Sequence, residues 1–460
     1  MARDYWAEYK SKLRTPEQVA AMVESEWVVN YGAFNIKSPA FDKALGARAG
    51  EPGLEKVYVK TSNNLPPTPA VITNDPEQKT FQVGCWFLSA LDRYWYDQML
   101  LDFLPLNYHD TNLMSYWPDK TWSGRRGDLL AVQVGPMDKH GNFNFGIMSS
   151  DVKAKCYANR YTVVEVNENI PNVLGGLQNT LHISEVDFII EGENPPLFTV
   201  DPVPPNENER KIAEQIMTHI HDGCCLQLGI GPLPNTIGDL ICQSDLKDLG
   251  LHAEMFCTSM MNMHELGIVN NSKKQTDRFK SVFSFAFGSA ELYEFIDNNP
   301  LLASYYIEYV NMPWRIAQNE NVISVNNTLQ VDLLTQANSE SIGPKTISGA
   351  GGQLDWVNGA FDSKGGKSFL AFESTYVDKD GNLKSRIVPT LEPGTAVTVP
   401  RHTIHWVVTE YGMTNLKGLS TWERAEEMVR LAHPKFRDEL LKEAQKLGIW
   451  KRTNRRALDA

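Results

Sequence analysis

Residues 223–244 read GCCLQLGIGPLPNTIGDLICQS, which is an apolar run, a glycine turn and a helical pattern in immediate succession. The run 223–231 has the length and composition of a buried strand, and the spacing of apolar residues after it predicts a helix that opens near Pro234. A strand followed at once by a helix is the repeating unit of a parallel sheet, because parallel strands need a crossover connection. This stretch therefore predicts an α/β fold.

The same order of elements repeats further along the chain. Residues 249–256, LGLHAEMF, predict another strand, and the helical pattern that follows stops at Gly267. Near the C-terminus, Ser420 and Glu423 form a Ser-x-x-Glu capping box, which marks the start of a helix. Such alternation predicts mostly parallel sheets flanked by helices.

The N-terminal half contains apolar runs of its own, such as GDLLAVQVGPM at 127–137. Residues 136–141, PMDKHG, predict a turn whose flanking strands pair as a hairpin. Residues 191–210 are crowded with Pro, Asn and Glu, a composition typical of a linker. We therefore expect two α/β domains, at residues 1–205 and 206–460.

Composition excludes several classes of protein. With 460 residues, 42% hydrophobic and 22% charged, the chain has an ordinary globular composition, and we expect no membrane partner. The N-terminal stretch MARDYWAEYKSKLRTPEQ lacks an apolar signal segment, and the six cysteines lack disulfide or metal spacing. We expect a cytoplasmic protein without a metal site. The net charge of −12 argues against a nucleic-acid partner.

Two glycine-rich turns are candidates for ligand binding, because the ligand crevice of an open α/β sheet lies beyond the carboxyl ends of its strands. The first turn, GIGPLPN, contains Gly229 and Gly231 before a helix whose positive end favours anions. The second, SGAGGQLDW, contains Gly349, Gly351 and Gly352, whose amides are able to point at an oxyanion. The alternative to ligand binding is an ordinary tight turn for the first stretch and a flexible hairpin tip for the second.

Glu254 is a single carboxylate inside the apolar run 249–256. An unpaired acid in such surroundings is costly to bury, so a capping or surface role is the common outcome. A catalytic role becomes the better interpretation only if other functional elements converge on it.

The ordered series of motifs resembles the acetyl-CoA hydrolase/transferase family, in particular its butyryl-CoA:acetate CoA-transferases, with 4-hydroxybutyrate CoA-transferases as near relatives. The resemblance extends from about Tyr9 to Arg455. The motifs that carry it are PMDKHGNFNFG at 136–146, VEVNENIP at 164–171, LQLGIGPLPN at 226–235, LGLHAEMF at 249–256, SIGPKTISGAGGQLDWVNGA at 341–360, SRIVPTL at 385–391, VVTEYG at 407–412 and the long motif at 418–444.

The resemblance implies two tandem CoA-transferase-type domains with the active site between them, and Glu254 as the catalytic glutamate. It also implies a set of coenzyme A contacts. These are Gly229, Ile230, Gly231, Pro232, Leu233, Leu329, Gly352 and Lys379. The amides of Gly351 and Gly352 are the expected oxyanion donors. The chain departs from the family pattern at Thr258, where relatives usually carry Asp, and this bears on the acid-binding pocket.

The expected reaction moves coenzyme A between a short-chain acyl-CoA, such as butyryl-CoA or propionyl-CoA, and acetate, through a glutamyl-CoA thioester. An acyl-CoA hydrolase or a 4-hydroxybutyrate CoA-transferase on the same scaffold remains an alternative. A dinucleotide oxidoreductase fits poorly because Pro234 occupies the place of the third glycine. A non-catalytic CoA-binding protein is a further alternative. We expect coenzyme A thioesters as substrates, no permanently bound cofactor, and a homo-oligomer.

Overall fold

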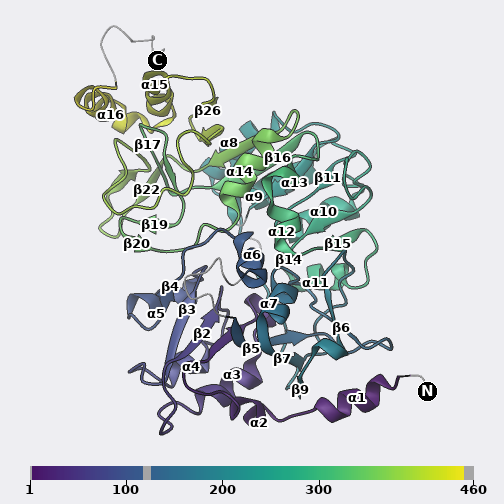
Figure 1. The fold of residues 1–460 in the computed structure, drawn as a ribbon. Coiled ribbons are helices and arrows are strands. Elements are labelled where there is room, and N and C mark those ends of the chain that lie inside the picture. The colour runs from purple at the N-terminus through teal and green to yellow at the C-terminus, as the bar shows by residue number, and fades with distance from the viewer. Residues whose placement is uncertain (1–2, 118–125, 202, 230, 450–460) are drawn as a thin grey trace. The chain divides into compact units, whose positions relative to one another are not determined.

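The computed structural model describes residues 3–117, 126–201, 203–229 and 231–449 (Figure 1). Its contacts divide the chain into two compact units. The first contains the residues up to Asp201 together with Glu254–Cys257 and Val282–Val310, and the second contains the remainder. The chain thus leaves the first unit inside the linker-like stretch 191–210 and returns to it twice. Glu254, expected in the second of two sequence domains, belongs by its contacts to the first unit.

Among the described residues, the first unit contains a seven-stranded sheet in which every adjacent pair is parallel. Its strands in spatial order are β4 (Asp102–Phe103), β3 (Phe81–Cys85), β2 (Val57–Thr61), β1 (Val28–Tyr31), β5 (Gly127–Val134), β7 (Asn159–Val166) and β9 (Phe188–Glu191). Parallel strands of this kind are covered on both faces, which explains the continuous apolar runs of β5 and β7.

The two faces of this sheet are covered by different helices. Alternate strand residues, such as Val29 and Val59, pack with Phe41 and Leu45 of α3 (Pro39–Gly46) in one core. The opposite face carries α7 (Val152–Ala158), which packs on β5 and β7 and against α6 (Asp110–Tyr116). Further helices of this unit are α1 (Tyr5–Lys12), α2 (Pro16–Ala20), α4 (Ala70–Thr73), α5 (Ala90–Asp97) and α11 (Ala290–Ile296).

The predicted hairpin around residues 136–141 is wrong in its pairing. The turn itself forms, since the amide of Asp138 donates to the carbonyl of Asn142 at 2.8 Å. However, β6 (Asn142–Asn144) pairs with β8 (Thr180–His182), while β5 lies between β1 and β7. β1 and β7 are longer partners for β5 than β6 is, so β5 pairs with them in the sheet although the turn after it forms.

The strand predicted over 249–256 is split in two. β11 (Gly250–Leu251) pairs with β10 (Cys225–Leu228) in the second unit, and β12 (Met255–Phe256) pairs with β14 (Phe285–Ala286) in the first. The break falls at Ala253 and Glu254, where the chain passes from one unit to the other.

The second unit contains a six-stranded sheet within the described residues, parallel except for its last pair. Its order is β11, β10, β16 (Val322–Asn327), β21 (Lys367–Ala371), β25 (Trp406–Thr409) and β26 (Gly412–Asn415). Its longer helices are α8 (Glu207–Met217), α9 (Pro232–Cys242), α10 (Thr258–Glu265), α14 (Gln353–Asp362), α15 (Thr421–Leu431) and α16 (Pro434–Lys446). The prediction of α/β units with mostly parallel sheets is confirmed.

Smaller elements complete the chain. They are β13 (Ser281–Phe283), β15 (Leu302–Ser304), α12 (Ile307–Asn311), α13 (Pro313–Ile316), β17 (Gln330–Asp332), β18 (Ala337–Asn338), β19 (Ser341–Ile342), β20 (Lys345–Thr346), β22 (Thr375–Val377), β23 (Leu383–Ser385) and β24 (Ile387–Val388). The capping box of Ser420 and Glu423 is confirmed at the start of α15, whereas α9 begins at Pro232 rather than at Pro234. None of the helices in the described residues has the length and apolar content needed to cross a bilayer.

Replacing Leu45 by Ala is expected to lower the free energy of unfolding by about 2–5 kcal/mol, because it leaves a cavity in the core on α3. Leu177 is 69% exposed, whereas Leu45 is fully buried. The matched control Leu177→Ala should therefore cost less than about 1 kcal/mol. Urea unfolding of both variants checks this, and equal stability of the two would contradict the placement of this core.

Candidate active site

The backbone of Glu254 is fixed at the start of β12. Its carbonyl oxygen accepts hydrogen bonds from the amides of Ser284 at 3.0 Å and Phe285 at 3.2 Å. Met255 and Phe256, which follow it, are buried and pair in register with Phe285 and Ala286. Glu254 itself is only partly buried. The acid is therefore held by its main chain while its side chain keeps access to a ligand.

A buried phenol lies close to this acid. The hydroxyl groups of Tyr108 and Ser150 form a hydrogen bond of 2.7 Å. Burial raises the pKa of Tyr108 well above its usual value, and the negative charges of Asp151 and Glu254 raise the pKa further. Tyr108 is therefore a neutral hydroxyl group within electrostatic reach of the Glu254 carboxylate.

Tyr108 and Phe285, whose amide donates to Glu254, belong to a connected group of aromatic rings. Phe34 lies with its ring centroid 5.0 Å from that of Phe285 and 5.6 Å from that of Phe287. The ring centroid of Tyr108 lies 6.2 Å from that of Phe285 and 5.0 Å from that of Trp86. A group of rings of this kind next to a reacting acid would limit the access of water, which matters for any acyl intermediate that water is able to hydrolyse.

Sequence reasoning did not find this aromatic group. Phe34, Trp86 and Tyr108 come from three distant segments, and no spacing in the sequence connects them to residue 254. The sequence shows only the neighbours that follow Glu254 directly, Met255 and Phe256, and both are buried.

The first glycine turn follows β10 in the second unit. The amide of Gly229 donates to the carbonyl of Val325 at 3.0 Å, which continues the sheet pairing. Gly231 precedes α9 with φ 119° and ψ −179°, a region that is almost exclusive to glycine. Pro232 and Leu233 open the helix, whereas Ile230 lies outside the described residues. A glycine-dependent turn therefore connects the end of β10 to the start of α9.

The second glycine turn lies at the same edge of that sheet. Gly351 has φ +56°, and Gly352 is the residue that precedes α14. Gln353 donates from Nε2 to the carbonyl of Asn327, the last residue of β16, at 2.7 Å. A Cβ atom placed on Gly231 would lie 3.4 Å from Nδ2 of Asn327. Asn327 therefore connects the two turns, since β10 and β16 are adjacent parallel strands.

Leu329 and Lys379 differ in their relation to these turns. Leu329 follows β16 two residues after Asn327, and its carbonyl accepts a hydrogen bond from Arg386 at 3.3 Å. Lys379 is exposed at the tip of the hairpin formed by β22 and β23. Its role toward a ligand stays a prediction. Within the described parts of the chain, no three His, Cys, Asp or Glu residues gather as a metal site.

The family follows from comparison with known proteins. Residues 1–201 match the model of the acetyl-CoA hydrolase/transferase N-terminal domain, and residues 288–444 match that of the C-terminal domain. The chain belongs to the acetyl-CoA hydrolase/transferase family. Glu254 lies between the two matched segments.

Individual relatives cover nearly the whole chain. A probable butyrate:acetyl-CoA coenzyme A-transferase of Syntrophomonas wolfei is 43% identical over 97% of this chain and 98% of its own length. A butyryl-CoA:acetate CoA-transferase of Anaerostipes caccae is 40% identical over 97% and 99%. The crystal structure of RipA from Yersinia pestis superimposes with a TM-score of 0.87 at 34% identity, covering 97% of this chain and 100% of RipA.

The substitution Gly231→Asn is expected to destabilise the protein by about 1–3 kcal/mol, because a side chain is strained at its backbone angles. The matched control is Gly267→Asn, after α10, where φ is +72° and no atom lies within 4 Å of an added Cβ. Asn tolerates that left-handed conformation, so the control should keep nearly full stability. Thermal unfolding distinguishes the two, and an equally small loss at both positions would contradict the described turn.

Proposed function

We propose that the protein is a CoA-transferase that exchanges coenzyme A between a short-chain acyl-CoA, with butyryl-CoA as the first choice, and acetate. The proposal depends above all on Glu254, whose main-chain carbonyl accepts hydrogen bonds from two amides and whose carboxylate acts electrostatically on the neutral phenol of Tyr108. The names of the full-length relatives support butyryl-CoA and acetate as the substrates.

A carboxylate suits this exchange because it keeps the energy of the thioester. The Glu254 oxygen attacks the acyl carbonyl and the C–S bond breaks, which forms a mixed anhydride and releases coenzyme A as a thiolate. The thiolate then attacks the Glu254 carbonyl, which releases the first acid and leaves a glutamyl-CoA thioester. The acceptor acid attacks that thioester and reverses the two steps. A serine would form an ordinary ester and lose most of this energy.

The surroundings of Glu254 supply what these intermediates need. The rings of Phe34, Tyr108 and Phe285 exclude water from the anhydride and the thioester. The neutral phenol of Tyr108 adds no negative charge beside the acid. Asp151, the other carboxylate that acts on Tyr108, is paired with Lys155 at 2.9 Å.

The glycine turns of the second unit fit the binding of coenzyme A and of the developing oxyanion. We assign the oxyanion to the amides of Gly351 and Gly352, and a donor of this kind contributes about 3–4 kcal/mol to lowering a barrier. The start of α9 favours phosphate oxygens through its positive end. The proposed coenzyme A contacts are Gly229, Ile230, Gly231, Pro232, Leu233, Leu329, Gly352 and Lys379.

The variant Glu254→Gln is expected to lose transfer from butyryl-CoA to acetate by roughly a thousandfold or more, because the amide is a poor nucleophile. The matched control is Glu265→Gln, at the exposed end of α10, which should keep the full rate. Steady-state assays measure the rates, and circular dichroism confirms that both variants are folded. Full activity of the Glu254 variant would remove the assignment of the nucleophile.

The covalent intermediate is tested separately from the rate. Incubation with butyryl-CoA alone, followed by borohydride or hydroxylamine, should change the mass of the peptide that contains Glu254. No mass change in this peptide, during active exchange, would exclude the glutamyl-CoA thioester.

Acceptor dependence distinguishes transfer from hydrolysis, the second activity that the family name includes. With acetate present, the loss of butyryl-CoA should be matched by acetyl-CoA, and free coenzyme A should stay below about a tenth of the total. A thiol assay and chromatography of the two thioesters measure this. Free coenzyme A formed at the same rate with and without acetate would show a hydrolase.

A further inference from the structure

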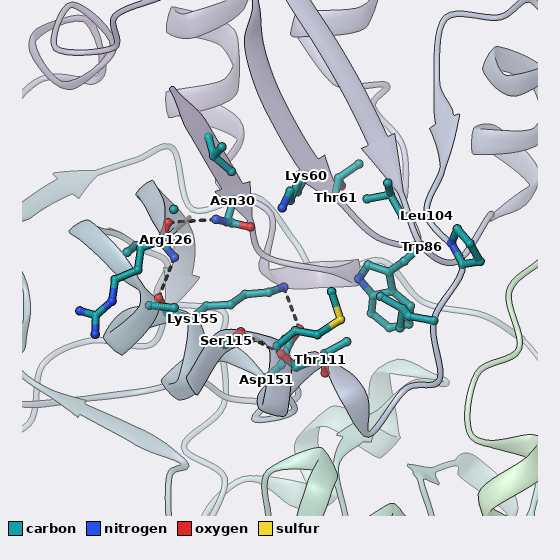
Figure 2. Close-up of a pocket in the computed structure, with 17 residues that line it drawn as sticks. Asn30, Lys60, Thr61, Trp86, Leu104, Thr111, Ser115, Arg126, Asp151 and Lys155 are labelled. Atoms are coloured by element: carbon teal, nitrogen blue, oxygen red, sulfur yellow. Dashed lines mark hydrogen bonds and ion pairs between the residues drawn. The ribbon is translucent and has the colours of Figure 1, made fainter. Parts of the chain in front are cut away.

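A cavity of about 280 Å³, partly open to solvent, is lined by residues of the first unit (Figure 2). It is formed by β1, β2, α6 and α7, on the face of the sheet opposite the Phe41 and Leu45 core. Asn30 and Lys60 are direct partners on neighbouring strands, so both side chains leave the sheet on this face. Glu254 is not among the residues that line the cavity.

One end of the cavity is cationic. In Figure 2 the amines of Lys60 and Lys155 point into the same space from a strand and from a helix. Lys155 forms an ion pair with Asp151 at 2.9 Å. The side chain of Lys60 makes no hydrogen bond or ion pair with any described residue; it is exposed and lines the cavity. The group of three therefore carries one net positive charge that is not compensated within it.

The two amines of this cationic end have like charges. Burial lowers the pKa of Lys60, and the positive charge of Lys155 lowers the pKa further, so the two amines repel each other. The guanidinium group of Arg126, a third cation of the wall, points away from the two amines in Figure 2. A monoanion between Lys60 and Lys155 would relieve the repulsion and neutralise the group.

The other end of the cavity is apolar. The ring of Trp86 is almost fully buried, and Leu104, Leu106 and Met114 lie beside it in the wall. A bare inorganic anion would leave these side chains against water, whereas an acid with a hydrocarbon tail would cover them. The volume is slightly below the roughly 300–1,000 Å³ of sites for drug-sized ligands, which fits a small molecule.

We propose that this cavity is a binding site for a small organic monocarboxylate, with the carboxylate between Lys60 and Lys155 and the tail against Trp86. The amines recognise the charge, and the apolar wall selects an acid with a hydrocarbon tail over phosphate. Glu254 does not line this cavity, although Trp86 of its wall also contacts the ring of Tyr108. The proposal does not depend on the proposed transfer reaction.

Isothermal titration with butyrate tests the site in the full chain. The unchanged protein should bind butyrate, and Lys60→Met should bind it at least about tenfold more weakly. The matched control is Lys139→Met, an exposed lysine of the turn at 136–141, which should bind as the unchanged protein does. Equal binding by the Lys60 and Lys139 variants, or no binding by the unchanged protein at millimolar butyrate, would overturn the proposal.

Two neutral or tail-less probes test the recognised chemistry. Butyramide has the same shape without the charge, and inorganic phosphate has charge without the tail; both should bind at least tenfold more weakly than butyrate. Equal affinity for either would overturn the proposal. Lys60→Met should unfold at the same temperature as the unchanged protein or a higher one, since it removes a like-charge contact, and Lys60→Gln serves as a second variant.

The glutamate variant separates this site from the catalytic one. Glu254→Ala should keep the Lys60-dependent binding of butyrate, whatever its effect on transfer. Loss of that binding in Glu254→Ala would place the acid at Glu254 and overturn the separate site. Loss of transfer in Glu254→Gln is measured independently, so the two proposals fail in distinguishable ways.

Discussion

The short parallel pairing of β12 with β14 is the constraint on which the candidate site depends. Two amides, from Ser284 and Phe285, hold the carbonyl of Glu254 in place. The next two residues are buried in register against β14, so the backbone has little freedom to turn the acid elsewhere. A nucleophile must be held in a reactive geometry, and a backbone fixed by hydrogen bonds does this without using the reacting oxygens themselves.

The charged and neutral groups near Tyr108 bear on the ionisation of Glu254. A second carboxylate close by would make ionisation of both acids unfavourable. Asp151, the other carboxylate that acts on Tyr108, pairs with Lys155, and the phenol of Tyr108 stays protonated. The ion pair of Asp151 and Lys155 therefore acts on two groups. The charge of Asp151 raises the pKa of Tyr108, and the charge of Lys155 lowers the pKa of Lys60.

The second unit shows how a parallel sheet gathers turns from distant parts of the sequence. β10 and β16 are adjacent, and their carboxyl ends lie at one edge. The turn after β10 and the turn before α14 both approach Asn327, although more than a hundred residues separate them. Glycine is required where Gly231 adopts backbone angles that side chains rarely allow.

The sequence by itself determined the α/β class, the parallel character of the sheets, the capping box of α15 and the family, because these follow from local periodicity and from ordered motifs. It also singled out Glu254 and the two glycine turns as candidates, while a capping or surface role and ordinary turns stayed the alternatives until the resemblance to the family was included. Only the tertiary structure decided that residues 249–256 form two short strands in different units, and that β6 pairs with β8. It alone brought Tyr108 within electrostatic reach of the acid, Phe34 and Trp86 to the rings of Phe285 and Tyr108, and Lys60 opposite Lys155. Such contacts join segments far apart in the chain, and they are chosen by competition among packing partners that no local pattern records.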